Sequence, residues 1–155
     1  IAEHMIQTAM LSEKDNSPQS LICACLLHDI GHFIIQDPDQ LVSKSIDGKH
    51  EDIAFNFLKN YFKTEVTEPI KLHVSAKRYL CREKSYYNLL SKASKVSLEL
   101  QGGKMNNDEA QKFILLKHHK DAITLRKYDD EGKIPNMKIK NINDYKELII
   151  SHLLN

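Results

Sequence analysis

Apolar residues recur along this chain at the three- and four-residue spacing of amphipathic helices, and no stretch keeps the apolar–polar alternation of a strand. The first helical pattern covers residues 1 to about 14. A second begins after a polar break at residues 16–18, where Pro18 suits the first position of a helix, and it continues to about Gln36. Residues 37–49 are polar and contain a proline and a glycine, so they predict a surface loop.

The rest of the chain shows the same helical spacing. One helix is expected to begin at His50, and another is expected to be opened by Pro69. A glycine pair at 102–103 and a polar stretch at 131–135 interrupt the later pattern. Because no repeat or change of composition divides it, we expect an all-α fold and one domain over residues 1–155. The later helices are expected over residues 69–81, 86–100, 107–116 and 143–154.

An adjacent pair, His28-Asp29, interrupts the longest apolar run of the chain. Burying an imidazole and a carboxylate among aliphatic side chains costs free energy unless a partner compensates, and a metal ion is the usual partner. Neighbouring helical residues point about 100 degrees apart, so both can bind one ion only beside the helix. Asp29 also has a second oxygen that can bridge to another ion. His32 lies one turn beyond His28 and faces the same way. The alternative is a core histidine hydrogen-bonded to the neighbouring acid.

Other imidazoles and carboxylates extend this pattern into further helices. His4, His50 and His73, taken singly, are more often structural or surface residues, and their weight comes from combination with the His-Asp pair. Nitrogen and oxygen donors favour Fe, Mn, Zn or Mg over a thiolate site. Two ions would account for all of these residues: His4, His28, Asp29 and Asp129 for one, and Asp29, His50 and His73 for the other.

Two cations accompany the candidate ligands. Lys77 lies one turn after His73, and Arg126 lies nearly one turn before Asp129. Cations beside a divalent cluster repel it unless an anion lies between them, so this arrangement predicts a phosphate or phosphonate site. The alternative is that both cations form ion pairs on the surface. Asp129 has a better spacing from Arg126 than Asp130 has, although the sequence separates these two acids only weakly.

Composition narrows the function classes. A formal net charge of +1 gives no reason to expect nucleic acid or an anionic membrane as a partner. The longest apolar run is shorter than the roughly 20 residues that span a bilayer. Three cysteines form no even disulfide set, which favours reduced thiols and a cytoplasmic protein. The chain begins with Ile1, and we expect that an N-terminal segment precedes it.

The order His4, His28-Asp29, Asp129 resembles the H…HD…D pattern of the HD-domain superfamily. That resemblance implies a single helical bundle with a metal site in its core. Residues 73–80 (His-Val-Ser-Ala-Lys-Arg-Tyr-Leu) and 100–105 (Leu-Gln-Gly-Gly-Lys-Met) are similar to a narrower group. This group comprises the mixed-valent diiron dioxygenases that cleave the carbon–phosphorus bond of 1-hydroxyphosphonates.

The resemblance implies an Fe(II)/Fe(III) pair and a reaction with O2. The substrate would be a small organophosphonate such as 2-amino-1-hydroxyethylphosphonate, and the products phosphate and a carboxylic acid. His32 and Lys77 are implied as catalytic residues. The implied iron ligands are His4, His28, Asp29, His50, His73 and Asp129, with Asp29 bridging. The implied phosphonate-binding residues are His32, Lys77, Ser94 and Arg126, with Gln101 a further candidate.

Two features depart from that group. Its members carry a tyrosine and an acid before the segment that matches Glu3-His4, and this chain begins too late to show them. Lys104 stands where proline is usual. The alternative function is a metal-dependent phosphohydrolase or phosphodiesterase that uses Mn, Mg or Zn on a phosphate ester or nucleotide. A third possibility is a regulatory or interaction module. Lys77, Ser94 and Arg126 favour the oxygenase.

Overall fold

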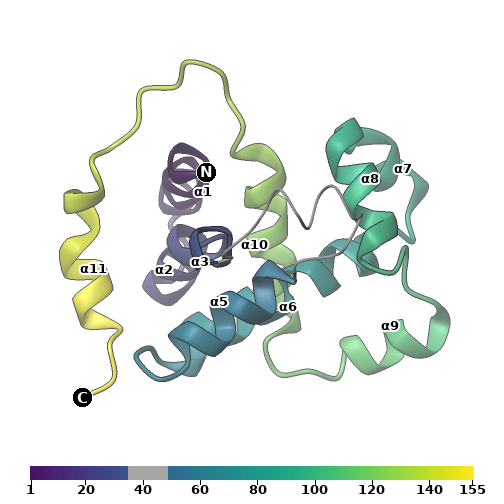
Figure 1. The fold of residues 1–155 in the computed structure, drawn as a ribbon, viewed down its shortest axis with the longest axis horizontal. Coiled ribbons are helices and arrows are strands. Elements are labelled where there is room, and N and C mark those ends of the chain that lie inside the picture. Colours follow the sequence, from purple (N-terminus) through teal and green to yellow (C-terminus); the bar gives the residue numbers. More distant parts are fainter. Residues whose placement is uncertain (35–48) are drawn as a thin grey trace.

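The computed structural model describes residues 1–34 and 49–155, and in these ranges the chain forms helices and no β-sheet (Figure 1). The all-α prediction is confirmed. A 3-10 turn, η1 (Ile142–Tyr145), precedes the last helix. The helices are α1 (Ala2–Lys14), α2 (Gln19–Leu27), α3 (Gly31–Ile34), α5 (His50–Leu58), α6 (Thr64–Leu80), α7 (Lys84–Leu89), α8 (Lys92–Leu100), α9 (Asn107–Phe113), α10 (His119–Glu131) and α11 (Lys146–Ser151).

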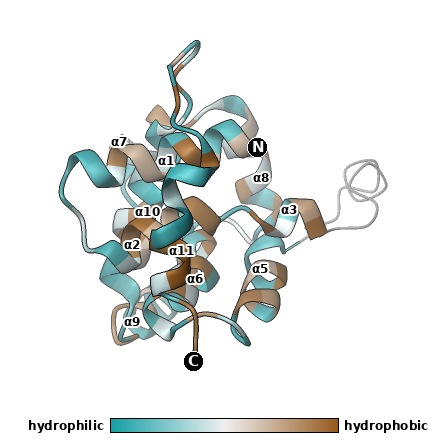
Figure 2. Cartoon of the chain, turned by 90° about the vertical axis from the view of Figure 1, so that its left-hand side faces the viewer, coloured by the Kyte–Doolittle hydropathy of each residue, from teal (hydrophilic) through white to brown (hydrophobic). Residues whose placement is uncertain are grey.

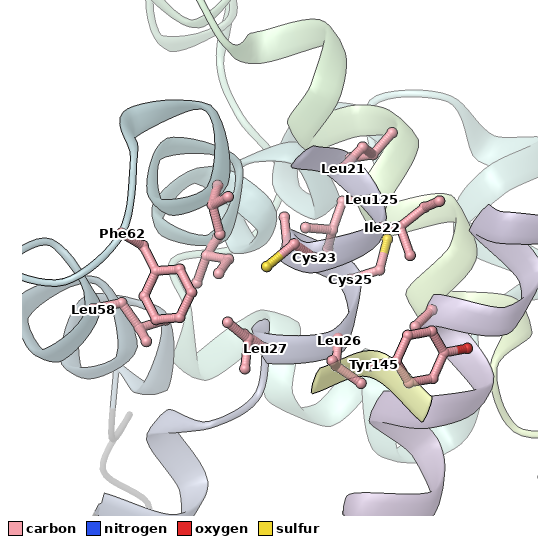
Figure 3. Close-up of a cluster of buried hydrophobic side chains, with 14 of the residues drawn as sticks. Leu21, Ile22, Cys23, Cys25, Leu26, Leu27, Leu58, Phe62, Leu125 and Tyr145 are labelled. Carbon is pink, nitrogen blue, oxygen red and sulfur yellow. The ribbon is translucent and has the colours of Figure 1, made fainter. Parts of the chain in front are cut away.

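The core lies around α2 and α6. All residues of α2 from Leu21 to Leu27 are buried, as expected for a helix that is apolar on every side. Helix α6 packs against α2, α5 and α10, and α1 packs against α2 and α10. Figure 3 shows the side chains of α2 meeting Leu58 and Phe62 on one side and Tyr145 on the other. This packing fixes the ends of α2, α6 and α10 relative to one another.

The prediction of one helix continuing to about Gln36 with His28 and Asp29 inside it is wrong. Helix α2 ends at Leu27, and α3 begins at Gly31. The intervening residues form tight turns, in which the Ile30 N–H donates to the Leu27 carbonyl (3.1 Å). The sequence hides this break because apolar residues lie on both sides of His28-Asp29, as a single helix would also place them. Gln36 and the predicted loop residues 37–48 lie outside the described residues.

Pro69 does not open a helix, because α6 begins five residues earlier at Thr64. An interior proline loses one backbone hydrogen bond and costs roughly 3 kcal/mol. The cost is offset by burial, since Val66 and Ile70 lie fully inside the core. The same face continues to His73, one turn after Ile70. The packing of α6 therefore buries the His73 imidazole on the face that also carries Val66 and Ile70.

The predicted helix over residues 86–100 is two helices. The backbone is extended at Leu90, and the Ser91 side chain caps α8 by accepting a hydrogen bond from the Ser94 N–H (3.1 Å). Helix α9 ends at Phe113, before the predicted residue 116, and α11 ends at Ser151. Figure 1 shows α7 and α8 beside one end of α6.

The described helices are amphipathic rather than uniformly apolar, apart from α2. Figure 2 shows hydrophilic and hydrophobic residues sharing most of them. Within residues 1–34 and 49–155, no helix is both long enough and apolar enough to cross a membrane. The three cysteines are buried and form no disulfide.

Candidate metal centre

Side chains from five segments converge between the end of α2, the middle of α6 and the last turn of α10. His4 comes from α1, His50 begins α5, and His73 lies on α6. The turn after α2 supplies the His28-Asp29 pair, and the last turn of α10 supplies Asp129. In each of two groups, the possible ligand atoms lie within 4.8 Å of one another. The first group is His4, His28, Asp29 and Asp129, and the second group is Asp29, His50 and His73.

Asp29 lies between the two groups. Its Oδ2 is 3.6 Å from His4 Nε2 and 3.3 Å from His28 Nε2. Its Oδ1 is 3.3 Å from His50 Nε2 and 3.7 Å from His73 Nε2. Each carboxylate oxygen thus faces a different set of imidazoles. The groups coincide with those expected from the sequence, and the role of their members as metal ligands remains a prediction.

Backbone carbonyls fix the orientation of three imidazoles. The Nδ1 atoms of His4, His28 and His73 lie 2.6–2.8 Å from the carbonyl oxygens of Gly132, Cys25 and Ile70, respectively. A carbonyl oxygen only accepts hydrogen bonds, so each Nδ1 carries a hydrogen and donates it. A neutral imidazole then has a bare lone pair on Nε2. A hydrogen bond from the other ring nitrogen to the protein is the usual way in which a metal-binding histidine is oriented.

These lone pairs lie close to carboxylate oxygens and to a further ring nitrogen. His4 Nε2 lies 2.7 Å from Asp129 Oδ1, and His50 Nε2 lies 3.1 Å from His73 Nε2. His28 Nε2 is buried and makes no hydrogen bond with any described residue. Such a concentration of electron pairs is unfavourable unless protons or cations lie among them. The donor set therefore fits metal ions, with nitrogen and oxygen ligands and no thiolate.

The charge states of the site also suit a cation. Burial alone would raise the pKa of Asp29, but His28 and His50 outweigh it and hold that pKa well below its usual value. Arg126 and His28 likewise outweigh burial and hold the pKa of Asp129 well below its usual value. Burial, with His50, lowers the pKa of His73 to about 3. At neutral pH both acids are carboxylates and His73 is neutral, which are the forms that bind metals. Burial alone would lower the pKa of His28, but Asp29 and Asp129 outweigh it and hold that pKa well above its usual value, so a metal ion would take the place of a proton on this imidazole.

Lys77 is buried beside the centre, and the alternative of a surface ion pair is wrong for it. Only 1% of this residue is exposed. Its Nζ donates to Ser97 Oγ (2.8 Å) and to Gln101 Oε1 (3.0 Å), which are both neutral groups. No carboxylate among the described residues forms an ion pair with it. Burial, assisted by Arg126, lowers the pKa of Lys77 to about 8.

Arg126 is buried as well, so the surface alternative is also wrong here. Its Nη1 donates to Asp129 Oδ2 (3.0 Å), and its Nη2 donates to Ser94 Oγ (3.2 Å). It also pairs with Asp130, which lies outside both groups. The structure thus separates the two acids that the sequence could not: Asp129 faces the imidazoles and the guanidinium, whereas Asp130 faces the guanidinium and Tyr86.

Two predicted residues lie at the edge of this arrangement. The His32 ring stacks on the His50 ring with centroids 4.2 Å apart, and 39% of its side chain is exposed. Gln101 contacts Lys77 through its side-chain oxygen. Sequence reasoning missed Ser97, although its place one turn before Gln101 on α8 is a usable signal. It also missed Tyr86, for which spacing gives no signal because α7 and α10 are distant in the sequence.

Two glycines lie close to candidate ligand residues. A Cβ atom on Gly31 would clash with the backbone carbonyl of His50. A Cβ atom on Gly132 would lie 2.6 Å from Thr8 Oγ1 and 3.3 Å from His4 Nδ1. Glycine therefore allows α3 to lie against the start of α5, and allows the end of α10 to lie against α1.

Replacing these glycines by alanine is expected to affect the two groups selectively. Gly31→Ala would displace His50 and weaken metal binding at the second group, whereas Gly132→Ala would displace His4 and weaken it at the first. We expect each variant to retain about half of the wild-type metal after it is loaded with excess metal and the unbound ions are removed. Metal content by elemental analysis, with circular dichroism as a check of folding, measures this. Full metal content in both folded variants would contradict the expectation.

Comparison with known proteins places this geometry in context. The sequence profile of the HD domain matches residues 1–152. The hydroxymethylphosphonate dioxygenase of Gimesia maris is 41% identical over 145 residues, which cover 92% of this chain and 72% of that protein. The [1-hydroxy-2-(trimethylamino)ethyl]phosphonate dioxygenase (glycine-betaine-forming) of Leisingera caerulea is 39% identical over 139 residues, covering 89% and 71%.

Proposed function

The chain belongs to the HD-domain family, and from that premise we propose that it is a metal-dependent oxygenase that cleaves the C–P bond of a 1-hydroxyphosphonate. Two relatives named as dioxygenases of such phosphonates support the proposal. The observation that carries it is the position of Lys77 and Arg126, two buried cations beside carboxylate and imidazole groups that fit metal ions. We call Lys77, Ser94 and Arg126 the phosphonate subsite.

The proposed metal is a pair of iron ions. His4, His28, Asp29 and Asp129 would hold one ion, and Asp29, His50 and His73 the other. When bound, iron would supply the redox chemistry that O2 requires. All of the candidate donor atoms are nitrogen or oxygen, which supports iron over a metal that prefers thiolate ligands. The nearby thiol of Cys25 is buried, and burial raises its pKa to about 12, so it remains a neutral thiol.

The proposed reaction balances without another oxidant or reductant. One 1-hydroxyphosphonate and one O2 give one carboxylic acid and one phosphate. The C–P bond and the C–H bond of the hydroxyl-bearing carbon break. One oxygen atom of O2 is added to that carbon and the other to phosphorus. The hydrogen from carbon becomes an acidic O–H proton of the products.

The residues of this chain would bind and orient the substrate. The Lys77 ammonium and the Arg126 guanidinium would neutralise the phosphonate oxygens, and the Ser94 hydroxyl lies within reach of the same guanidinium. Lys77 is suited to this task because its hydrogen-bond partners are neutral and leave its charge uncompensated. An anion held there would place its attached carbon toward the two ligand groups.

Phosphate release in air and under argon tests the function. Fe(II)-loaded protein is supplied with hydroxymethylphosphonate or 2-amino-1-hydroxyethylphosphonate, and methylphosphonate, which lacks the 1-hydroxyl group, is the matched control. We expect release from the hydroxylated compounds in air only. Release from phosphate esters with Mn or Mg under argon would instead assign a phosphohydrolase. Absence of release from every hydroxylated phosphonate in air would overturn the proposal.

A further inference from the structure

The guanidinium of Arg126 is held from several sides. Its Nε donates to the Tyr86 hydroxyl (3.3 Å), its Nη1 to Asp129 Oδ2 (3.0 Å) and its Nη2 to Ser94 Oγ (3.2 Å). Its Nη2 also pairs with Asp130 Oδ1. Arg126 therefore contacts one proposed metal ligand, one residue of the phosphonate subsite, and two residues, Tyr86 and Asp130, that have no proposed role.

A count of donors shows what this arrangement achieves. A guanidinium has five N–H groups, and four of them are directed at the side chains just named. The remaining N–H belongs to Nη1, on the side of the metal ligand Asp129. Because a guanidinium is planar and rigid, fixing Nε and Nη2 also fixes the direction of Nη1.

Tyr86 and Asp130 support each other. The Tyr86 hydroxyl donates to Asp130 Oδ2 (2.5 Å) while it accepts from Arg126 Nε. Burial raises the pKa of Tyr86, so its hydroxyl stays protonated and can keep both roles. Asp130 thus receives one hydrogen bond on each oxygen. The three side chains form a closed ring of hydrogen bonds between α7 and α10.

We propose that Tyr86 and Asp130 are positioning residues that orient the Arg126 guanidinium toward the phosphonate. They act through Arg126 and do not touch the substrate. This inference rests on the proposed function, because it takes Arg126 to be a ligand of the phosphonate group. It assigns the first turn of α7 a role in substrate affinity, although α7 contributes no proposed metal ligand.

The geometry explains why Arg126 needs this support. Without Tyr86 and Asp130, its remaining contacts would be Asp129 and Ser94. Asp129 is shared with the proposed metal, so its charge is divided between two cations. A guanidinium held mainly by that acid would turn toward it and away from a bound anion. Asp130 supplies a counter-charge on the opposite edge and keeps the group in place.

Two substitutions test the role. Tyr86→Phe removes one hydroxyl and keeps the ring, and Asp130→Asn removes one charge. We expect each variant to raise the KM for hydroxymethylphosphonate by about threefold to thirtyfold, since a neutral or charged hydrogen bond is lost. The kcat and the bound iron are expected to stay within about twofold of wild type, because the reacting centre is untouched. A residue with only a structural role would not produce this separation of KM from kcat.

Two neighbouring residues provide matched controls. Tyr87→Phe removes a hydroxyl from the same helix, and Glu131→Gln removes a charge from the same end of α10. Neither residue forms a hydrogen bond or an ion pair with Arg126 in the described part of the chain. Both controls are expected to match wild type. Unchanged KM in Tyr86→Phe and Asp130→Asn, or changes equal to those of the controls, would overturn the inference.

Titration with inorganic phosphate separates this inference from the proposed function. Calorimetry on the metal-loaded protein gives a phosphate Kd without turnover, and we expect both variants to weaken it in parallel with KM. If the wild type binds phosphate but turns over no phosphonate, the proposed function fails while the positioning role is still decided by the phosphate Kd. If the wild type binds no phosphate, or the variants bind it as tightly as wild type does, the positioning role is wrong.

Discussion

Asp29→Ala is expected to abolish metal binding at both groups. Its two carboxylate oxygens face different imidazole sets, so one substitution removes a ligand from each group. No other residue belongs to both groups among the described residues. The change also removes the negative charge of the Asp29 carboxylate, which would stabilise a metal ion bound by the surrounding imidazoles. Loss of a ligand from each group is therefore expected to cost more metal affinity than the roughly tenfold to hundredfold that follows loss of a contact behind a ligand.

Elemental analysis of folded, metal-loaded Asp29→Ala provides the measurement, and Asp108→Ala, an exposed acid on α9, is the control. Asp29→Asn gives a finer comparison, because an amide offers one carbonyl oxygen and one NH2 group that cannot bind a cation. We expect the asparagine variant to retain at most one ion. Retention of two ions by the alanine variant would remove Asp29 from the ligand set, and retention of one would rule out the bridge.

Lys77→Met is expected to weaken phosphonate binding strongly while leaving both metal groups intact. Methionine fills a similar volume, and Lys77 contacts no proposed metal ligand through its ammonium group. The lost charge-assisted interaction with a phosphonate oxygen predicts a rise in KM of about tenfold to a hundredfold. Removing a buried charge with neutral partners is also expected to maintain or raise the Tm.

Steady-state kinetics, bound iron and a thermal melt together measure this expectation. Lys71→Met is the matched control, because Lys71 lies on the same helix, is exposed and contacts Phe55 through its ammonium group. A KM within twofold of wild type in Lys77→Met would remove this residue from the phosphonate subsite. Loss of iron in the same variant would show that Lys77 supports the ligand groups instead.

The helical fold could be predicted from the sequence because apolar spacing reports burial directly. Apolar spacing misplaces a helix boundary where buried residues continue beyond the end of the helix. Apolar residues lie on both sides of residues 28–30, where the chain turns. Pro69 looked like a helix start because its local preference is strong, but the buried face of α6 outweighs that preference. Local rules therefore found most of the helices, but they misplaced several boundaries that the core sets and joined α7 and α8 into one helix.

The candidate centre could be predicted as a combination of residue types. His28-Asp29 is costly to bury without a partner, and that cost led to His4, His50, His73 and Asp129. The contacts that surround the candidate ligands could not be predicted from the sequence, for two reasons. The Nδ1 contacts of His4, His28 and His73 are to backbone carbonyls, which the sequence does not encode as residue types. The contact between Tyr86 and Asp130 joins elements 44 residues apart.

The two groups differ in how much of the chain each one needs. The second group draws on residues 29, 50 and 73, whereas the first group joins His4 on α1 to Asp129 on α10. Closing a long loop costs more entropy than closing a short one, and contacts distant in sequence form later in folding. We therefore expect the second group to assemble when α5 and α6 dock on α2, and the first only when α10 arrives. Asp29 would then belong both to the group that forms early and to the group that forms late, so the complete centre would form only in the last stage of folding.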